Sequence, residues 1–389
     1  MEKVLIVYTV TIVKHMEVSM NMLRSRALSL SLSTIFLVSF GHTKTHDYSD
    51  TFAGSMLAGG IGDALGRVTE FIPSTDEIFQ KYPHGVHSYD DFLVDDWKYV
   101  PVVLKDKKIK IAPYTDDTAM AKLVMKELIQ AREHNWDLDE TMRHIATSFI
   151  DDAQDTQLGW AARFRAPGNA CKAGVKQLSI NFRENRQWDV QANTAGGCGS
   201  VMRAHPFGLV FVDNPKKAAL WAAEHSKLTH GDPIALAACA AMATGVAYAA
   251  QGENPNIITE KMIAAAGQYD AVTARKMERA YKFAQQAKTY KGHELRKHND
   301  KVFTEFLGWA AHDAIAATVY AFTLSPDNVM EAIYLGVHTP GDSDSIASMA
   351  GALVGARIGA KALPKELIER LENSAQLKFD AEKAACLLN

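Results

Sequence analysis

The segment 338–359, HTPGDSDSIASMAGALVGARIG, restricts the fold more than any other part of the chain. Its first half is a tight acidic turn, and the residues that follow are small and apolar at helical spacing. Ala347, Gly351, Gly355 and Gly359 recur every four residues and therefore share one ridge of the predicted helix. Glycine in mid-helix costs about 1 kcal/mol relative to alanine. The ridge therefore predicts a second helix packed closely against this one.

A second acidic turn, TDDT at 115–118, precedes another predicted helix far upstream. Taken alone, Asp342 and Ser343 are typical of a helix cap, because carboxylates at a helix N-terminus offset its macrodipole. Two such turns would repel each other if the fold brought them together without a cation. The candidate ligands are all hard oxygen atoms, which favours Mg²⁺ over Zn²⁺, with Mn²⁺ or Ca²⁺ as alternatives. Adjacent carboxylates on each turn suggest two ions bridged by shared aspartates.

Composition places the chain among globular proteins with a large core, since 47% of its 389 residues are hydrophobic. The net charge is −3 and no basic block occurs, so nucleic-acid binding has little support. The four cysteines form no CxxC pair, which suggests neither a disulfide framework nor a structural zinc site. A reducing, cytoplasmic location is the expectation that follows.

Helical periodicity dominates from residue 51 onward, and strand-like alternation is scarce. We expect one all-α domain over 51–389. Helices are predicted at 52–64, 119–132, 138–150, 215–227, 233–250, 257–268, 271–288, 303–322, 326–336, 346–359 and 364–371. Between them, the proline-containing stretch 73–113 is predicted to be irregular, and its length suggests a functional or lid-like loop.

Two further stretches carry candidate functional residues. In GDALGRVTEF (62–71), Asp63 and Glu70 would lie near each other if one helix continued through both, although a solvated or capping carboxylate is the simpler interpretation. In NTAGGCGSVMRAHPFG (193–208), glycines leading into a helix would present backbone N–H groups, as phosphate-binding loops do. The spacing matches neither GxGxxG nor a Walker loop, so a tight turn with close helix contact is the alternative.

Residues 1–50 form a predicted N-terminal extension. Arginines at 24 and 26 precede an apolar run, so residues 22–41 resemble a signal peptide and export is an alternative location. The apolar runs of the extension are shorter than the roughly 20 residues that span a bilayer. A partner-binding arm or a misassigned start are the other interpretations.

The motifs GDALGRVTEF, YTDDTAM, GCGSVMRAHPFG, LTH and GDSDSIASMAGALVGARIG occur in order over most of the chain. In this combination the chain resembles the ADP-ribosylglycohydrolase (ADP-ribosyl-acceptor hydrolase) family. The resemblance implies an all-α fold that holds two Mg²⁺ ions. It also implies an enzyme that removes ADP-ribose from modified protein side chains. It implies catalytic roles for Glu70, Asp117 and Asp344, with Glu70 as acid, base or water-positioning group. The implied metal ligands are Thr115, Asp116, Asp117, Asp342, Asp344 and Ser345, and the implied diphosphate and ribose site is lined by Gly197, Gly199, Ser200 and Met202.

Two positions of the acidic turn depart from the family's usual GGDxDT. Ser345 replaces threonine and keeps the hydroxyl, whereas Pro340 replaces a glycine and removes an N–H group. We expect an ADP-ribosylarginine-type hydrolase that acts on ADP-ribosylated proteins, without nucleic acid or a membrane span. One alternative is an immunity protein that blocks an ADP-ribosyltransferase toxin by occupancy through its N-terminal extension. Another is a metal-dependent phosphoesterase that acts on a nucleotide diphosphate.

Overall fold

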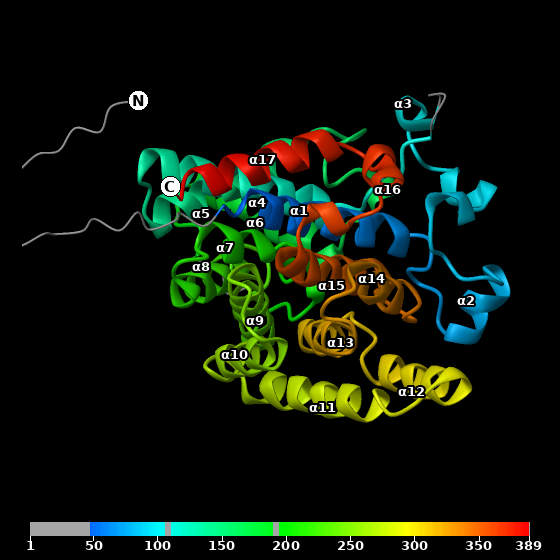
Figure 1. The fold of residues 1–389 in the computed structure, drawn as a ribbon. Helices are drawn as coiled ribbons and strands as arrows, with labels where there is room; N and C mark the ends of the chain where they lie inside the picture. Colours follow the sequence, from blue (N-terminus) through cyan, green and yellow to red (C-terminus); the bar gives the residue numbers. More distant parts are fainter. Residues whose placement is uncertain (1–46, 106–109, 190–193, 389) are drawn as a thin grey trace, which may run out of the picture. The chain divides into compact units, whose positions relative to one another are not determined.

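The structure is a computed structural model that describes residues 47–105, 110–189 and 194–388 (Figure 1). These residues form 17 α-helices and no strand, apart from two isolated bridges, which confirms the predicted all-α class. The helices are α1 (Ser49–Gly66), α2 (Thr75–Lys81), α3 (Val102–Lys105), α4 (Asp116–His134), α5 (Leu138–Asp152), α6 (Asn169–Arg183), α7 (His205–Val210), α8 (Pro215–Ser226), α9 (Pro233–Ala250), α10 (Pro255–Gly267), α11 (Ala271–Ala287), α12 (Gly292–Glu305), α13 (Ala311–Leu324), α14 (Val329–Val337), α15 (Ser343–Ile358), α16 (Lys365–Arg370) and α17 (Ser374–Cys386).

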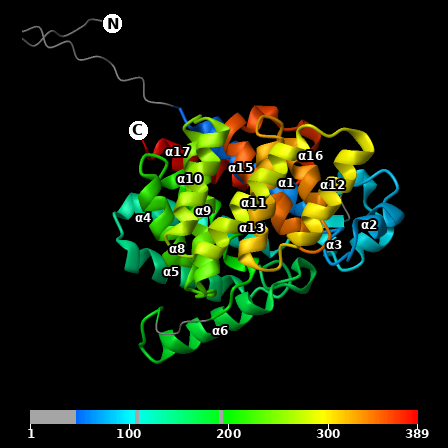
Figure 2. The same cartoon turned by 90° about the horizontal axis from the view of Figure 1, so that it is seen from below.

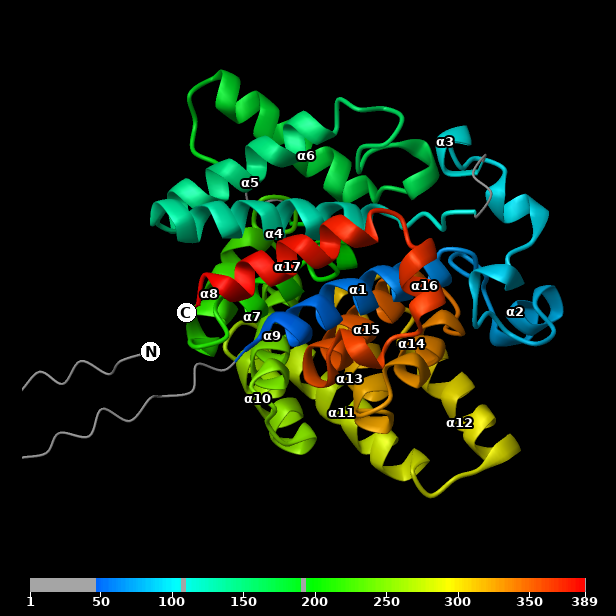
Figure 3. The same ribbon diagram turned by 45° about the horizontal axis from the view of Figure 1, so that its top comes forward.

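The glycine ridge of α15 packs against α1, as predicted. Gly54 of α1 faces Gly355, whereas Gly66 faces Asp344, so the two helices run antiparallel. A Cβ atom at Gly62 would overlap the carbonyl oxygen of Ala347, and one at Gly355 would overlap the carbonyl oxygen of Gly54. The two backbones are therefore in direct contact. In Figure 3, α4 to α6 lie on one side of this pair and α9 to α13 on the other.

Helix α1 ends at Gly66, so Asp63 and Glu70 do not share one helix. The expectation that one helix continues through both residues was therefore wrong. The chain turns at this point because the N-terminus of α15 lies against it: a Cβ at Gly66 would be 2.5 Å from the Cα of Asp344. The turn is fixed by the Thr69 hydroxyl, which donates to the carbonyl oxygen of Val337 at 2.6 Å. Asp63 is left inside the core and Glu70 on the following turn.

The single helix predicted at 303–322 is also wrong. The chain forms α12 and α13 instead, with a break between them at residues 306–310. Gly308 has a φ of +89° there, and a Cβ at this position would lie 2.8 Å from the Cβ of Asp342. Gly308 can adopt this φ and has no Cβ, so it lets the chain break here and pass close to the acidic turn.

The stretch 73–113 is more ordered than predicted, because it contains α2, α3 and two short 3₁₀ turns. Tyr82, Tyr89 and Trp97 anchor it to the core and are almost fully buried. Whether the stretch opens as a lid stays a prediction.

Helix α9 is long and apolar enough to cross a bilayer by composition, but 78% of it is buried inside the fold, as expected of a core helix. Figure 2 shows it among α8, α10 and α13, which it contacts. The predicted extension 1–50 lies outside the described residues except for its last four positions, and the signal-like segment 22–41 lies wholly outside them. The predictions of export, of cytoplasmic location and of a toxin-blocking arm therefore stay predictions.

Candidate functional site

An acidic centre lies where the turn after α1 meets the N-terminus of α15. Glu70, Asp342 and Asp344 each offer a carboxylate oxygen, and these oxygens lie within 4.8 Å of one another. Both aspartates are buried, whereas Glu70 is half-buried. Glu70 is therefore the carboxylate of this group that faces the accessible side.

The acidic turn at α15 does not act as an ordinary helix cap. Asp342 occupies the N-cap position, but its side chain accepts no capping hydrogen bond. Its backbone N–H donates to the carbonyl oxygen of Leu307 at 2.9 Å, and the N–H of Gly341 donates to Ile72 at 3.3 Å. These bonds hold the turn without an N–H at Pro340, so the proline departure leaves the turn intact.

Glu70 reaches the centre because its turn is hydrogen-bonded to the same segment. The N–H of Phe71 donates to the carbonyl oxygen of Gly341 at 3.1 Å. The Ser343 hydroxyl donates to the carbonyl oxygen of Gly66 at 3.0 Å. These two hydrogen bonds hold the turn after α1 against the start of α15, and the Glu70 side chain therefore lies beside the two aspartates.

The second acidic turn converges on the same centre, as the sequence interpretation required. Thr115 is the N-cap of α4, and its hydroxyl donates to Oδ1 of Asp117 at 3.2 Å. Asp344 lies close enough to Asp116 and Asp117 for its charge to raise the pKa of both carboxyl groups. Asp116 accepts a hydrogen bond from the N–H of Gly168 at 3.3 Å. The residues predicted to bind metal thus come together from α4 and α15; their role as ligands stays a prediction.

Asp63 joins α1 to the acidic turn at 115–118, a role that the sequence did not reveal. It is fully buried in α1, and its carboxylate accepts from the N–H of Thr115 at 2.7 Å. It also accepts from the N–H of Thr118 at 2.9 Å and from the Thr118 hydroxyl at 2.6 Å. Asp63 therefore caps a helix other than its own and holds α4 in register with α1.

We expect Asp63→Ala to destabilise the Mg²⁺-loaded protein by about 3 kcal/mol, because buried donors of Thr115 and Thr118 lose their acceptor. Urea denaturation in excess Mg²⁺ measures this cost, and a Mg²⁺ titration should show weaker binding. Asp137→Ala is the matched control: Asp137 caps α5 at an exposed site and should cost only about 1 kcal/mol. Equal costs in the two variants would contradict the positioning role of Asp63.

The electrostatics of the centre favour a bound cation. Burial, followed by the charge of Asp344, raises the pKa of Asp63 to about 7 and that of Asp116 to about 8. Burial and neighbouring carboxylates also raise the pKa values of Glu70, Asp117 and Asp342 well above their ordinary range.

Among the described residues no lysine or arginine forms an ion pair with these acids, and the buried Oδ2 of Asp117 has no hydrogen-bond partner. An all-oxygen set with surplus negative charge and an unpartnered carboxylate oxygen fits a hard divalent cation.

The glycine-rich segment lies beside the acidic centre. Gly197 pairs with Ala310 in an isolated bridge, and the Ser345 hydroxyl approaches the Met202 sulfur at 3.9 Å. The Ser200 hydroxyl is turned into the core, where it bonds with that of Ser226 at 2.8 Å. The structure thus places Gly197 and Met202 near the acidic centre. Because the Ser200 hydroxyl is bonded inside the core, Ser200 could contact a ligand only through its backbone.

A buried cation lies behind this segment, and the sequence interpretation did not assign it. Arg203 is fully buried and forms no ion pair in the described part of the chain. Its Nη2 donates to the Thr229 hydroxyl at 2.6 Å, and that hydroxyl bonds to Nδ1 of His230 at 2.8 Å. The ring of His230 is packed against Gly199, where an added Cβ would lie 2.9 Å from its Cε1. The glycine-rich segment therefore has a positive charge directly behind it.

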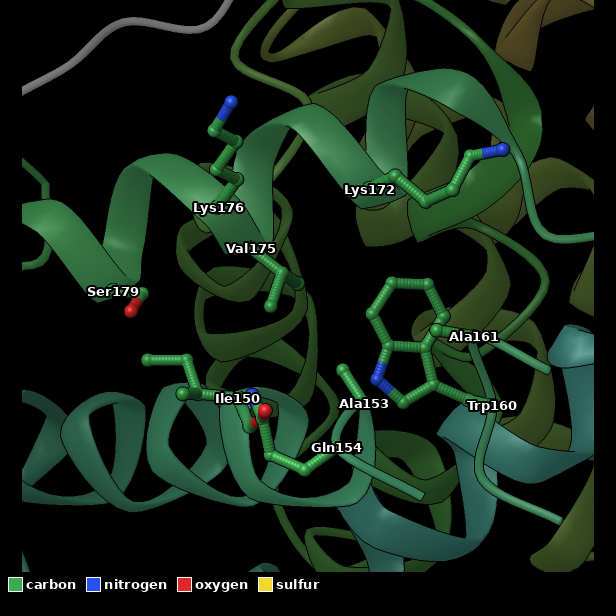
Figure 4. Close-up of a pocket in the computed structure, with 9 residues that line it drawn as sticks. All are labelled: Ile150, Ala153, Gln154, Trp160, Ala161, Lys172, Val175, Lys176 and Ser179. Carbon is green, nitrogen blue, oxygen red and sulfur yellow. The ribbon is translucent and has the colours of Figure 1, made fainter. Parts of the chain in front are cut away.

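A separate cavity of about 250 Å³ lies between α5 and α6 (Figure 4). Its floor is apolar, with Trp160, Val175 and Ile150 facing inward, while Lys172 and Lys176 point away from it. No acidic residue lines it and none of the predicted site residues reaches it. The acidic centre is therefore the better candidate for chemistry.

The fold of the described residues is all-helical, and its acidic centre is a group of carboxylates that could hold a metal ion. The ADP-ribosylglycohydrolase family model matches residues 44–388, and the chain belongs to that family. This confirms the family that the motifs indicated.

Curated relatives carry related names. The chain is 22% identical over 340 residues to ADP-ribosyl-[dinitrogen reductase] glycohydrolase of Rhodospirillum rubrum, with 87% of this chain and 96% of the relative covered. It is 24% identical over 334 residues to ADP-ribosylhydrolase ARH3 of Xenopus tropicalis, covering 80% and 88%. It is 24% identical over 337 residues to ADP-ribosylarginine hydrolase Tri1 of Pseudomonas putida, covering 86% and 77%.

Among solved structures, the fold matches an ADP-ribosylglycohydrolase-related protein complex with a TM-score of 0.62 and 19% sequence identity. The match covers 88% of this chain and 99% of that one. At this identity the match shows the shared fold.

Proposed function

We propose that the protein is a Mg²⁺-dependent hydrolase that removes ADP-ribose from modified arginine side chains of proteins. The observation that carries the proposal is the convergence of Glu70, Asp342 and Asp344, whose carboxylate oxygens lie within 4.8 Å of one another. Asp116 and Asp117 of the second acidic turn lie close enough to this group for the charge of Asp344 to raise the pKa of both.

The surroundings of the glycine-rich segment support a diphosphate-containing substrate. Backbone N–H groups of a glycine-rich turn bind phosphate oxygens without steric hindrance. The buried guanidinium of Arg203 contributes a positive charge on this side, and it donates to Thr229, whose hydroxyl bonds to the ring of His230. The opposite charges of the two regions would orient ADP-ribose, with phosphates at the glycines and the distal ribose at the carboxylates.

Mg²⁺ ions held by Thr115, Asp116, Asp117, Asp342, Asp344 and Ser345 would bind ribose hydroxyls and fix the sugar ring. Cleavage at the anomeric carbon passes through a transition state with cationic character at that carbon. The buried carboxylates stabilise this charge because little water screens it. Glu70, the half-buried carboxylate of the group, orients the attacking water or exchanges a proton with it.

The proposed acceptor is arginine. Two of the relatives bear names for an arginine linkage or for ADP-ribosylated dinitrogen reductase. The charged guanidinium of the substrate departs as a neutral guanidine, which needs less help from a general acid than the alkoxide of serine would, and this suits a centre with one modest general acid.

The test is to incubate the protein with an arginine-ADP-ribosylated substrate, with and without EDTA. We expect release of intact ADP-ribose that EDTA abolishes and added Mg²⁺ restores. Release of AMP would instead support a phosphoesterase, and binding without turnover would support a protein that acts by occupancy.

A further inference from the structure

Two exposed aromatic rings stack on each other at the edge of the acidic centre. Phe71 and Trp309 have ring centroids 5.2 Å apart with an angle of 18° between the ring planes. Their side chains are nonetheless 63% and 43% exposed. Large exposed aromatic surfaces are costly in water and commonly mark binding sites.

The backbone at Phe71 is held in an unfavourable conformation. Its φ is +66°, a left-handed value that a bulky residue rarely adopts and that costs on the order of 1–3 kcal/mol. The hydrogen bond from its N–H to Gly341 fixes this conformation. Strain of this kind persists where the surrounding structure enforces it, and here it directs the ring toward Trp309.

Trp309 is anchored between the two halves of the site. Its carbonyl oxygen accepts from the N–H of Cys198 at 3.1 Å, next to the glycine-rich segment. Its indole Nε1 lies against Gly341: a Cβ atom added to Gly341 would be 3.2 Å from this nitrogen. Phe71 directly follows Glu70 in the chain, so the aromatic pair flanks the carboxylates where bond cleavage is proposed.

An open depression of about 420 Å³ lies on the Phe71 side of this pair, lined by Phe71, Ile72, Pro73, Glu77, Gln80 and Lys81. Phe71 directly follows Glu70 in the chain, and no residue of the glycine-rich segment lines the depression. A substrate with its phosphates at the glycines and its distal ribose at the carboxylates would direct its acceptor toward this depression.

We propose that Phe71 and Trp309 form an acceptor platform that stacks the guanidinium of the ADP-ribosylated arginine and thereby selects arginine linkages. This inference rests on the proposed function. A planar guanidinium is attracted by the faces of aromatic rings, most strongly by tryptophan, and is less strongly hydrated than an ammonium group. The nearby carboxylate of Glu70 complements the same charge. An acceptor oxygen of serine carries no charge and gains nothing from the rings.

The kinetic test compares Phe71→Leu and Trp309→Leu, which remove a ring but keep apolar volume, with Trp309→Phe, which keeps a ring. We expect roughly a tenfold rise in KM for ADP-ribosylarginine in the leucine variants, with kcat changed less than about twofold. Trp309→Phe keeps a ring, so its KM for ADP-ribosylarginine should stay close to that of the wild type. Inhibition by free ADP-ribose, which has no acceptor, should be unchanged in all three.

Phe379→Leu is the matched control, because Phe379 is 59% exposed on α17, outside the site, and should leave KM as in the wild type. Equal weakening of ADP-ribose inhibition and of KM would overturn the proposal, since the rings would then bind the ADP-ribose portion. An unchanged KM in both leucine variants would overturn it as well.

A binding measurement separates this proposal from the proposed function. Saturation-transfer NMR with ethylguanidinium, in the presence of ADP-ribose and Mg²⁺, should give a signal with the wild type and none with Phe71→Leu or Trp309→Leu. Ethanol should give no signal with any of them. Absence of guanidinium binding in the wild type would overturn the platform even if arginine linkages are cleaved. Binding without cleavage would support the platform and contradict the hydrolase.

Discussion

Asp344→Ala is expected to lower kcat for ADP-ribosylarginine by roughly 10³-fold or more while leaving the helical circular dichroism spectrum unchanged. Asp344 is the acid whose charge acts on Asp63, Asp116 and Asp117 together. Its loss therefore removes the group that both acidic turns share. Asp327→Ala, at an exposed aspartate paired with Arg357, is the control and should keep full activity.

The same variant should respond differently to metal. In EDTA no cation offsets the repulsion between the carboxylates of the wild type. Asp344→Ala removes one of these carboxylates, so its Tm in EDTA should equal or exceed that of the wild type. Added Mg²⁺ should raise the Tm of the wild type by about 2 °C or more, because ligands that bind only the folded state stabilise it. The variant should gain much less. Normal turnover in Asp344→Ala, or an equal gain in Tm from Mg²⁺, would remove the site assignment.

Gly62→Ala is expected to destabilise the protein by about 3 kcal/mol or more, although alanine is the better helix former. The added methyl would overlap the backbone of Ala347, and backbone cannot move aside as a flexible side chain can. Separation of α1 from α15 would also displace Asp344, so activity should fall with stability. Chemical denaturation and the turnover assay measure the two effects.

Gly59→Ala on the same helix is the matched control. Its Cβ would lie 3.4 Å from the Cβ of Ala352, an ordinary contact distance. We expect a neutral or slightly stabilising effect there. Equal losses at Gly59 and Gly62 would show that backbone contact is not what makes Gly62 sensitive.

Much of the fold could be predicted because local signals mark the helix boundaries. Asp232 and Asn254, each followed by proline, cap α9 and α10 through their side chains, and Asp270 caps α11. The break at Gly308 could not be predicted, because apolar residues continue the helical pattern through it and its close approach to Asp342 is visible only in the tertiary fold. Helices α6 and α17 were missed.

The site was predictable where adjacent residues carry the chemistry and not where partners are distant. The turns at 115–118 and 342–345 were visible as acidic clusters before helices, and the structure brings them together. Asp63 was visible as an acid, but its partners Thr115 and Thr118 lie on another helix. Phe71 and Trp309 carried no sequence signal, since only the tertiary fold stacks their rings.

The backbone contact between α1 and α15 bears on which ion the proposed metal site would accept. Gly66 holds the main chain of Asp344, so the carboxylates of α15 cannot retreat from those that Asp63 positions on α4. A cage of this kind has little freedom to expand around a larger ion that demands seven or eight oxygens. The site would then prefer magnesium to calcium because of its size. The glycine contacts between α1 and α15 would set that size, although none of these glycines would touch the ion.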